Sequence, residues 1–168
     1  MKWFKTTIIA ALLIATPVLG SPPARYPVPN NLLVDIQPEE PGRFSKPVKV
    51  KIVFTSQIGT TRNVDASFYT SENLVVEPAK AKIDVLEEGV RQEIMVIVKS
   101  KGSKKGKGEK WVQVNYTQVP DYPRMIEWVK TNKNKYSSPD LAAKLIRNLK
   151  DYKDEGRAFR SSLTYDFQ

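Results

Sequence analysis

Histidine and cysteine are both absent from this sequence of 168 residues, so carboxylates, lysines and hydroxyls are left as its reactive side chains. Without histidine and cysteine, neither a Ser-His-Asp triad nor a Cys-His pair can form. The histidine and cysteine ligands of most zinc, haem and iron–sulfur sites are missing too. The Ser-x-x-Lys dyad of penicillin-binding enzymes occurs at no serine. We therefore expect no metal and no cofactor, and any acid–base chemistry falls to carboxylates.

Two pairs of adjacent carboxylates are the candidates for such chemistry, because glycosidases work with two carboxylic acids. Glu39 and Glu40 precede a proline, and Glu87 and Glu88 precede a glycine. Both settings are typical of solvated turns. The sequence therefore predicts a protein that is not an enzyme. The alternative is a carbohydrate- or peptidoglycan-active enzyme whose carboxylates follow no recognised pattern.

Residues 99–110 form the most distinctive segment, with six lysines, three glycines and a single glutamate. One interpretation is a flexible, solvated hairpin loop that keeps the protein soluble. The other is an electrostatic site for phospholipid headgroups, lipopolysaccharide phosphates or acidic cell-wall polymers. Nucleic acid is not expected, because no aromatic residue alternates with the lysines to stack on bases. The candidate binding residues are Lys99, Lys101, Lys104, Lys105, Lys107 and Lys110.

The positive charge is distributed unevenly along the chain, which carries 27 basic and 18 acidic residues and a formal net charge of +9. Residues 21–98 hold 9 basic and 10 acidic groups, whereas residues 124–168 hold 10 basic and 6 acidic groups. The excess of basic residues in the mature chain is thus confined to the lysine-rich segment and the C-terminal tail. A partner with an anionic surface fits this distribution.

The amino-terminal residues have the pattern of a secretory signal peptide, with Lys2 and Lys5 followed by a charge-free run over residues 6–19. We expect cleavage after Gly20. The alternative is an uncleaved anchor, although this run is shorter than the roughly 20 apolar residues that a membrane-spanning helix needs. No later segment is apolar enough to span a membrane, so the mature chain is expected to have no transmembrane span. We expect a periplasmic or secreted protein. A bacterial origin is favoured, because small extracellular animal domains commonly contain disulfides.

Short segments with the period of β-strands fill residues 32–119. In one of them Val48, Val50, Ile52 and Phe54 fall on one face, because side chains alternate along a strand. Their spacing predicts an antiparallel sandwich of about seven strands. The last two are expected to form a hairpin around the lysine-rich segment. The predicted strands cover residues 32–36, 48–54, 64–70, 74–76, 83–86, 94–98 and 111–119.

The turns between these segments, a Glu-Pro after residues 74–76 and an acidic-Gly turn after residues 83–86, complete the pattern. Over about residues 30–119 it resembles the fibronectin-type and bacterial Ig-like β-sandwich modules of exported proteins. The Cys-Trp-Cys core of antibody domains is absent. The resemblance implies a binding or structural module, and it implies no particular activity, because unrelated functions share this architecture.

The period becomes helical after residue 121. A first helix is expected to bury Tyr122, Met125, Ile126 and Val129. A second is expected to begin at a Ser138 cap and to align Leu141, Leu145 and Leu149 on one face. The last residues are expected to be a loose strand or a frayed end. The predicted organisation is a signal peptide (1–20), an Ig-like sandwich (21–120) and a helical tail (121–168).

Met95 and Ile97 are expected on the outer face of the sandwich, because Ile94, Val96 and Val98 alternate with them. Trp111 is expected to point outward from the next strand. A solvated sheet face is usually polar, so we expect this patch to be covered by Met125, Ile126 and Val129 or by Leu141, Leu145 and Leu149. The alternative is that a partner protein covers the patch and the helix face.

These features combine into one prediction of function. We expect an exported, non-catalytic binding or structural module of the bacterial cell envelope. Its partner is expected to be an envelope protein or an anionic envelope component.

Overall fold

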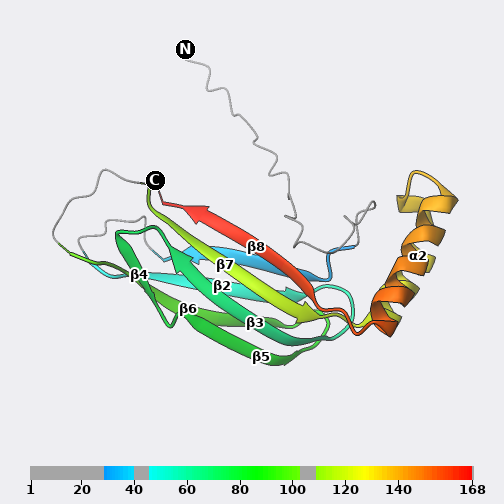
Figure 1. Cartoon of the computed structure of the whole chain (residues 1–168), viewed down its shortest axis with the longest axis horizontal. Coiled ribbons are helices and arrows are strands. Elements are labelled where there is room, and N and C mark those ends of the chain that lie inside the picture. The colour runs from blue at the N-terminus through cyan, green and yellow to red at the C-terminus, as the bar shows by residue number, and fades with distance from the viewer. Residues whose placement is uncertain (1–28, 40–45, 103–108, 168) are drawn as a thin grey trace, which may run out of the picture.

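A computed structural model describes residues 29–39, 46–102 and 109–167. The predicted signal peptide and Glu40 lie outside these residues, as do Lys104, Lys105 and Lys107. The described chain is mainly β, with eight strands in two antiparallel sheets and two helices at one end (Figure 1). The predicted β-sandwich with helices near its C-terminus is confirmed.

The two sheets contain four strands each. All seven predicted strands are present, and an eighth follows the helices. Sheet A has the order β1 (Leu32–Pro38), β2 (Val48–Ser56), β6 (Arg91–Ser100) and β4 (Leu74–Glu77). Sheet B has the order β5 (Lys80–Leu86), β3 (Thr61–Thr70), β7 (Trp111–Val119) and β8 (Phe159–Asp166).

The core lies between the sheets and is built by the predicted alternation. Phe54 of sheet A meets Tyr116 of sheet B edge to face, with ring centroids 6.2 Å apart. Val50, Ile52 and Val96 are completely buried around them. Each buried aliphatic or aromatic side chain of this size contributes about 1.5–3 kcal/mol to folding. The apolar periods in the sequence thus hold the two layers together.

The predicted hairpin between residues 94–98 and 111–119 is wrong. β6 pairs with β2 and β4 in sheet A, whereas β7 pairs with β3 and β8 in sheet B. Both strands point valines into the same core, including Val98 and Val112, and they do so from opposite sheets. Alternation tells which face of a strand is buried and does not tell which strand lies beside it. The lysine-rich segment is therefore a connection between sheets.

The helices are an insertion between two paired strands. α1 (Tyr122–Thr131), the short 3-10 helix η1 (Lys133–Lys135) and α2 (Pro139–Asp154) separate β7 from β8. β8 pairs with β7 from Gln118 opposite Phe159 to Trp111 opposite Asp166. Of the two alternatives for the last residues, the structure shows the strand, and because this strand belongs to sheet B it is not part of the helical tail predicted for residues 121–168.

Both helices begin where their capping residues predict. The Asp121 carboxylate accepts a hydrogen bond from the Arg124 backbone N–H at 3.0 Å, which caps α1. The Ser138 hydroxyl accepts one from the Leu141 N–H at 3.2 Å, so the predicted start of α2 is confirmed. α2 ends at Asp154 and is followed by Gly156, whose φ is +63°.

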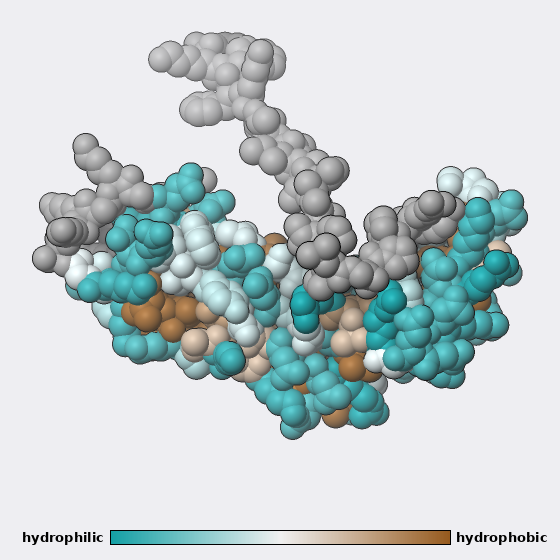
Figure 2. All heavy atoms as spheres, viewed as in Figure 1, coloured by the Kyte–Doolittle hydropathy of each residue, from teal (hydrophilic) through white to brown (hydrophobic). Residues whose placement is uncertain are grey.

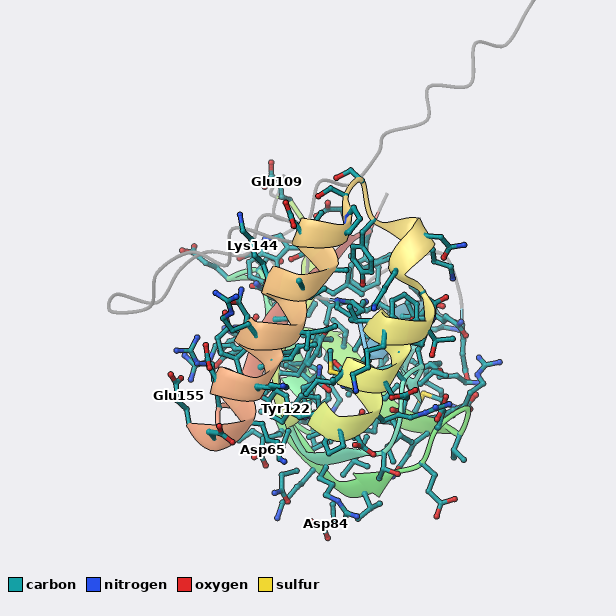
Figure 3. All side chains as sticks on the ribbon, turned by 90° about the vertical axis from the view of Figure 1, so that its right-hand side faces the viewer. Asp65, Asp84, Glu109, Tyr122, Lys144 and Glu155 are labelled. Atoms are coloured by element: carbon teal, nitrogen blue, oxygen red, sulfur yellow. The ribbon has the colours of Figure 1, made fainter. Side chains whose placement is uncertain are left out.

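The two helices lie side by side across the end of the sandwich (Figures 1 and 3). Their apolar faces pack against each other and against Ile58, which follows β2. The predicted apolar face of α1 is confirmed, and on α2 Leu145 and Leu149 are buried while Leu141 is half-buried. The buried helical residues of this second core are Tyr122, Met125, Ile126, Val129, Ala142, Leu145 and Leu149.

The predicted outer patch of Met95, Ile97 and Trp111 does not form, because Met95 and Ile97 lie on sheet A whereas Trp111 lies on sheet B, and the helices cover none of the three. These three residues belong to neither hydrophobic cluster of the described residues, and the Met95 side chain is 41% exposed. In the strand register Met95 lies opposite Lys51 and Ile97 lies opposite Lys49. Lysine methylene groups cover neighbouring apolar side chains while the charge stays in water, so this face needs no helix. The buried helix faces are not open to a partner protein either.

Gly59 joins the sandwich to the helices at a close contact. Its φ is +68°, and a Cβ there would lie 2.7 Å from the Asp121 Cβ and 2.8 Å from the Arg124 Cβ. Arg124 also pairs with Glu88 through Nε and Oε2, 3.2 Å apart. At the other end of the insertion, the Tyr122 hydroxyl donates a hydrogen bond to the Arg157 carbonyl. These contacts fix the base of the helical insertion.

A buried polar network lies near the same end of the sandwich. The side-chain amides of Asn31 and Gln118 exchange two hydrogen bonds of 3.0 Å, and both residues are almost fully buried. Ser56 and Thr61 share a hydrogen bond of 2.7 Å. The Ser56 hydroxyl also donates to the Gly59 carbonyl at 2.6 Å. Satisfied buried amides and hydroxyls specify one arrangement of these strand ends.

Candidate binding surfaces

The described flanks of the lysine-rich connection, residues 99–102 and 109–110, lie at the end of the sandwich away from the helices. The connection leaves sheet A at Ser100 and enters sheet B at Trp111, and β7 then runs to Val119 beside α1 (Figure 1). A strand rises about 3.4 Å per residue, so the length of β7 separates the connection from the helical insertion. The two regions with excess positive charge therefore occupy opposite ends of the protein.

Hydrogen bonds hold both flanks of this connection to the sandwich. The Lys101 N–H donates to the Asn73 carbonyl at 2.9 Å, and the Lys110 carbonyl accepts from the Phe167 N–H at 2.8 Å. The Lys99 Nζ lies 2.5 Å from a Glu77 carboxylate oxygen, and both side chains are exposed. An exposed ion pair of this kind contributes about 0–1 kcal/mol, so it leaves Lys99 available to another anion.

The helical insertion carries a second basic region that the sequence interpretation did not identify as a site. Lys130, Lys133 and Lys135 lie at the end of α1 and in η1, and the Lys135 Nζ is 5.1 Å from the centre of the Trp128 ring. Lys144 of α2 is also exposed (Figure 3). Hydrophilic residues dominate this end in Figure 2. The signal in the sequence was the excess of 10 basic over 6 acidic groups in residues 124–168.

The outer face of sheet B carries polar side chains on all four of its strands, and the sequence interpretation missed it. Strand register places its side chains in rows across the sheet. A middle row contains Ser67, Asn115 and Ser162, and Lys80 extends it onto β5. We call the following residues the sheet B face: Asp65, Ser67, Tyr69, Lys80, Lys82, Trp111, Gln113, Asn115, Thr117, Arg160, Ser162 and Thr164. In residues 113–117, polar side chains alternate with apolar ones, and this alternation could have indicated a polar outer face.

A shallow hollow of about 530 Å³ opens at one edge of this face, and its lining includes Asp65, Ser67, Lys80 and Lys82. The Lys82 Nζ pairs with Asp84 at 3.0 Å. The hydrogen bond and charge of Asp84, together with the charge of Asp65, raise the pKa of Lys82. The edge of the face thus contains charges of both signs.

The described candidate carboxylates, Glu39, Glu87 and Glu88, lie at the surface of the protein. Glu87 and Glu88 are both exposed, and Glu88 is engaged by Arg124. The Arg124 hydrogen bond holds the pKa of Glu88 below its usual value. A general acid in a glycosidase needs a raised pKa instead. Glu39 is exposed, and within the described ranges no three Asp or Glu side chains gather into a group that could hold a metal ion.

Comparison with known proteins returns no relative: no protein-family model matches this sequence, and no curated protein matches it. Among the described residues, neither helix combines the length and apolar character that a membrane crossing requires.

Proposed function

We propose that this protein is an exported, non-catalytic binding module of the bacterial cell envelope, with an Ig-like sandwich as its scaffold. Its lysine-rich end contacts an anionic envelope component. The order of sheet A, β1-β2-β6-β4, supports the Ig-like assignment, because it corresponds to the A-B-E-D sheet of immunoglobulin domains when β5, which lies in sheet B, is counted as an additional strand. The amino-terminal sequence pattern supports export.

The observation that carries the proposal is the place of the lysine-rich connection. It joins the two sheets at one end of the sandwich, and its flanks are hydrogen-bonded to Asn73 and Phe167. Loops at the ends of a rigid sandwich are where such domains bind their partners. Each lysine near an anionic surface contributes about 1 kcal/mol, so several together give useful affinity even after the loss of loop entropy.

Vesicle sedimentation tests this function. The protein beginning at Ser21 is mixed with vesicles of phosphatidylglycerol or of phosphatidylcholine at low and high salt. We expect binding to phosphatidylglycerol alone, and weaker binding as salt rises, because salt screens charges. The test variant changes Lys101, Lys104, Lys105 and Lys107 to serine.

A matched variant removes four lysines from the opposite end through Lys130→Ser, Lys133→Ser, Lys135→Ser and Lys144→Ser. The proposal predicts that the first variant loses binding and that the matched variant keeps most of it. Equal binding by the first variant and the unchanged protein would remove the lysine-rich connection from the function. Loss of binding only in the matched variant would move the site to the helices.

A further inference from the structure

We propose that the sheet B face binds an uncharged glycan chain, in addition to the anionic partner of the lysine-rich end. Trp111 lies at the edge of this face, where the lysine-rich connection enters sheet B. The site lies on β3, β5, β7 and β8, and no described helix packs on it, since the helices stand at the end of the sandwich. Its ligand is recognised by hydrogen bonds and ring stacking, so its binding does not depend on the charges of the lysine-rich end.

The middle row carries short side chains on three of its four strands. Ser67 on β3, Asn115 on β7 and Ser162 on β8 lie opposite one another in the register. The neighbouring rows carry Gln113 on one side and Thr117 on the other. Residues two apart on a strand are about 7 Å apart, so these rows are spaced to contact successive groups of an extended ligand.

The hydrogen-bonding groups of the face match the hydroxyls of a sugar, which donate and accept. Serine and threonine hydroxyls and the Gln113 amide both donate and accept. The Asn115 Oδ1 is enclosed by its neighbours and has no hydrogen-bond partner among the described residues. A buried acceptor without a partner costs free energy. A ligand hydroxyl that donated to Oδ1 would supply the missing hydrogen bond.

Two aromatic residues complete the site. The Tyr69 side chain is 50% exposed, and Tyr69 lies opposite Gln113 in the register. Trp111 is two residues before Gln113 on the same face, and its side chain is half-buried. Diagonal neighbours on a sheet are close enough for aromatic side chains to meet. An amphipathic aromatic ring offers an apolar surface on which the C–H face of a sugar stacks.

The charges on this face favour an uncharged ligand. Ser67, Gln113 and Asn115 at the centre are neutral, whereas the middle row ends at Lys80 and Asp166 lies opposite Trp111, so charges of both signs surround the centre. Asp65 lies opposite Thr117 in the register, and Thr117 lies opposite Arg160. Lys82 is paired with Asp84. A surface with both signs at its margin does not select an anionic polymer, whereas a polyhydroxyl chain satisfies donors and acceptors alike.

Electrophoresis of the basic native protein toward the cathode tests the proposal. The gels contain hydroxyethylcellulose, galactomannan or soluble β-glucan. Binding of chitohexaose is measured separately by titration calorimetry. We expect at least one polysaccharide to slow the migration of the protein, or chitohexaose to give a heat of binding, and we expect high salt to leave this binding unchanged. Asn115→Ala removes a hydrogen-bonding group and is expected to weaken binding about tenfold. Tyr69→Ala removes the exposed ring and is expected to weaken it at least as much.

Two control variants separate this site from other surfaces. Leu33→Ala with Gln37→Ala changes exposed residues of β1 on sheet A, and it must leave glycan binding intact. The serine variant of the lysine-rich connection must also leave it intact. Absence of binding to every neutral probe overturns the glycan site and leaves the vesicle test unaffected. Binding that survives Tyr69→Ala and Asn115→Ala, or that disappears in high salt, also overturns it.

Discussion

Replacement of Gly59 by alanine tests how the sandwich holds its helices. Gly59 has a φ of +68°, and the added Cβ would meet the Asp121 and Arg124 side chains at 2.7 and 2.8 Å. Both contacts involve atoms close to the α1 backbone, so the helix itself must shift to relieve them. The matched control is Gly89→Ala, because Gly89 has a φ of +78° and nothing within 4 Å of the added Cβ.

The magnitude follows from two separate costs. Each alanine adopts a left-handed conformation, which costs roughly 1–2 kcal/mol relative to glycine's preferences. Gly59→Ala also overpacks a filled contact, which typically costs about 1–3 kcal/mol more. We therefore expect the free energy of unfolding to fall by about 2–5 kcal/mol in Gly59→Ala and by about 1–2 kcal/mol in Gly89→Ala.

Urea unfolding followed by circular dichroism and tryptophan fluorescence measures both variants. Trp128 reports on the helical insertion and Trp111 on the sandwich, so single-tryptophan versions show which part is lost first. In Gly59→Ala we expect the Trp128 signal to change at lower urea than the Trp111 signal. Equal destabilisation of the two glycine variants, with coincident transitions, would refute the close contact between α1 and the sandwich.

Three further predictions concern the base of the insertion. Asn31→Ala and Gln118→Ala should each lower the free energy of unfolding by about 1–3 kcal/mol, because the first leaves the buried Gln118 amide without its partner and the second leaves the Asn31 side-chain carbonyl oxygen without one, and the double variant should cost less than their sum in a urea double-mutant cycle. Replacement of residues 121–157 by an Asn-Gly turn should leave a folded sandwich by circular dichroism, because β7 and β8 already pair; an unfolded product would contradict this. Burial raises the pKa of Tyr122 to about 12, so its contribution to stability is complete below about pH 10 and is lost as pH rises toward 12. Tyr122→Phe should therefore show a smaller loss of stability over that pH range, and an unchanged slope would contradict the assignment.

The layers of the fold could be predicted from sequence because their signals are local. The alternation of Val48, Val50 and Ile52 follows from strand geometry, and the Ser138 cap marks the start of α2. Strand partners are set by contacts between distant residues, so the assignment of β6 and β7 to one hairpin failed. β8 was also weakly marked, because an edge strand buries few side chains and its only half-buried aliphatic residue is Leu163.

Of the two candidate sites, one could be recognised from local sequence and the other depends on contacts between distant residues. A run of lysines is visible in any sequence, so the lysine-rich connection could be named before its position was known. The sheet B face could not be recognised from the sequence, because Ser67, Asn115 and Ser162 come from three strands that only the register brings together. The predicted contact of the helices with Met95 and Ile97 failed for a related reason. The lysines opposite them in the register could not be assigned from the apolar pattern alone.

Chemical-shift mapping by NMR tests the central claim most directly. Isotope-labelled protein beginning at Ser21 is titrated with phosphatidylglycerol micelles, and amide shifts are followed for the whole chain. The account predicts changes concentrated at residues 99–110 and weakened by salt, with little change in α1 and α2. Changes confined to the helices, or no change at residues 99–110 while the protein binds, would contradict it.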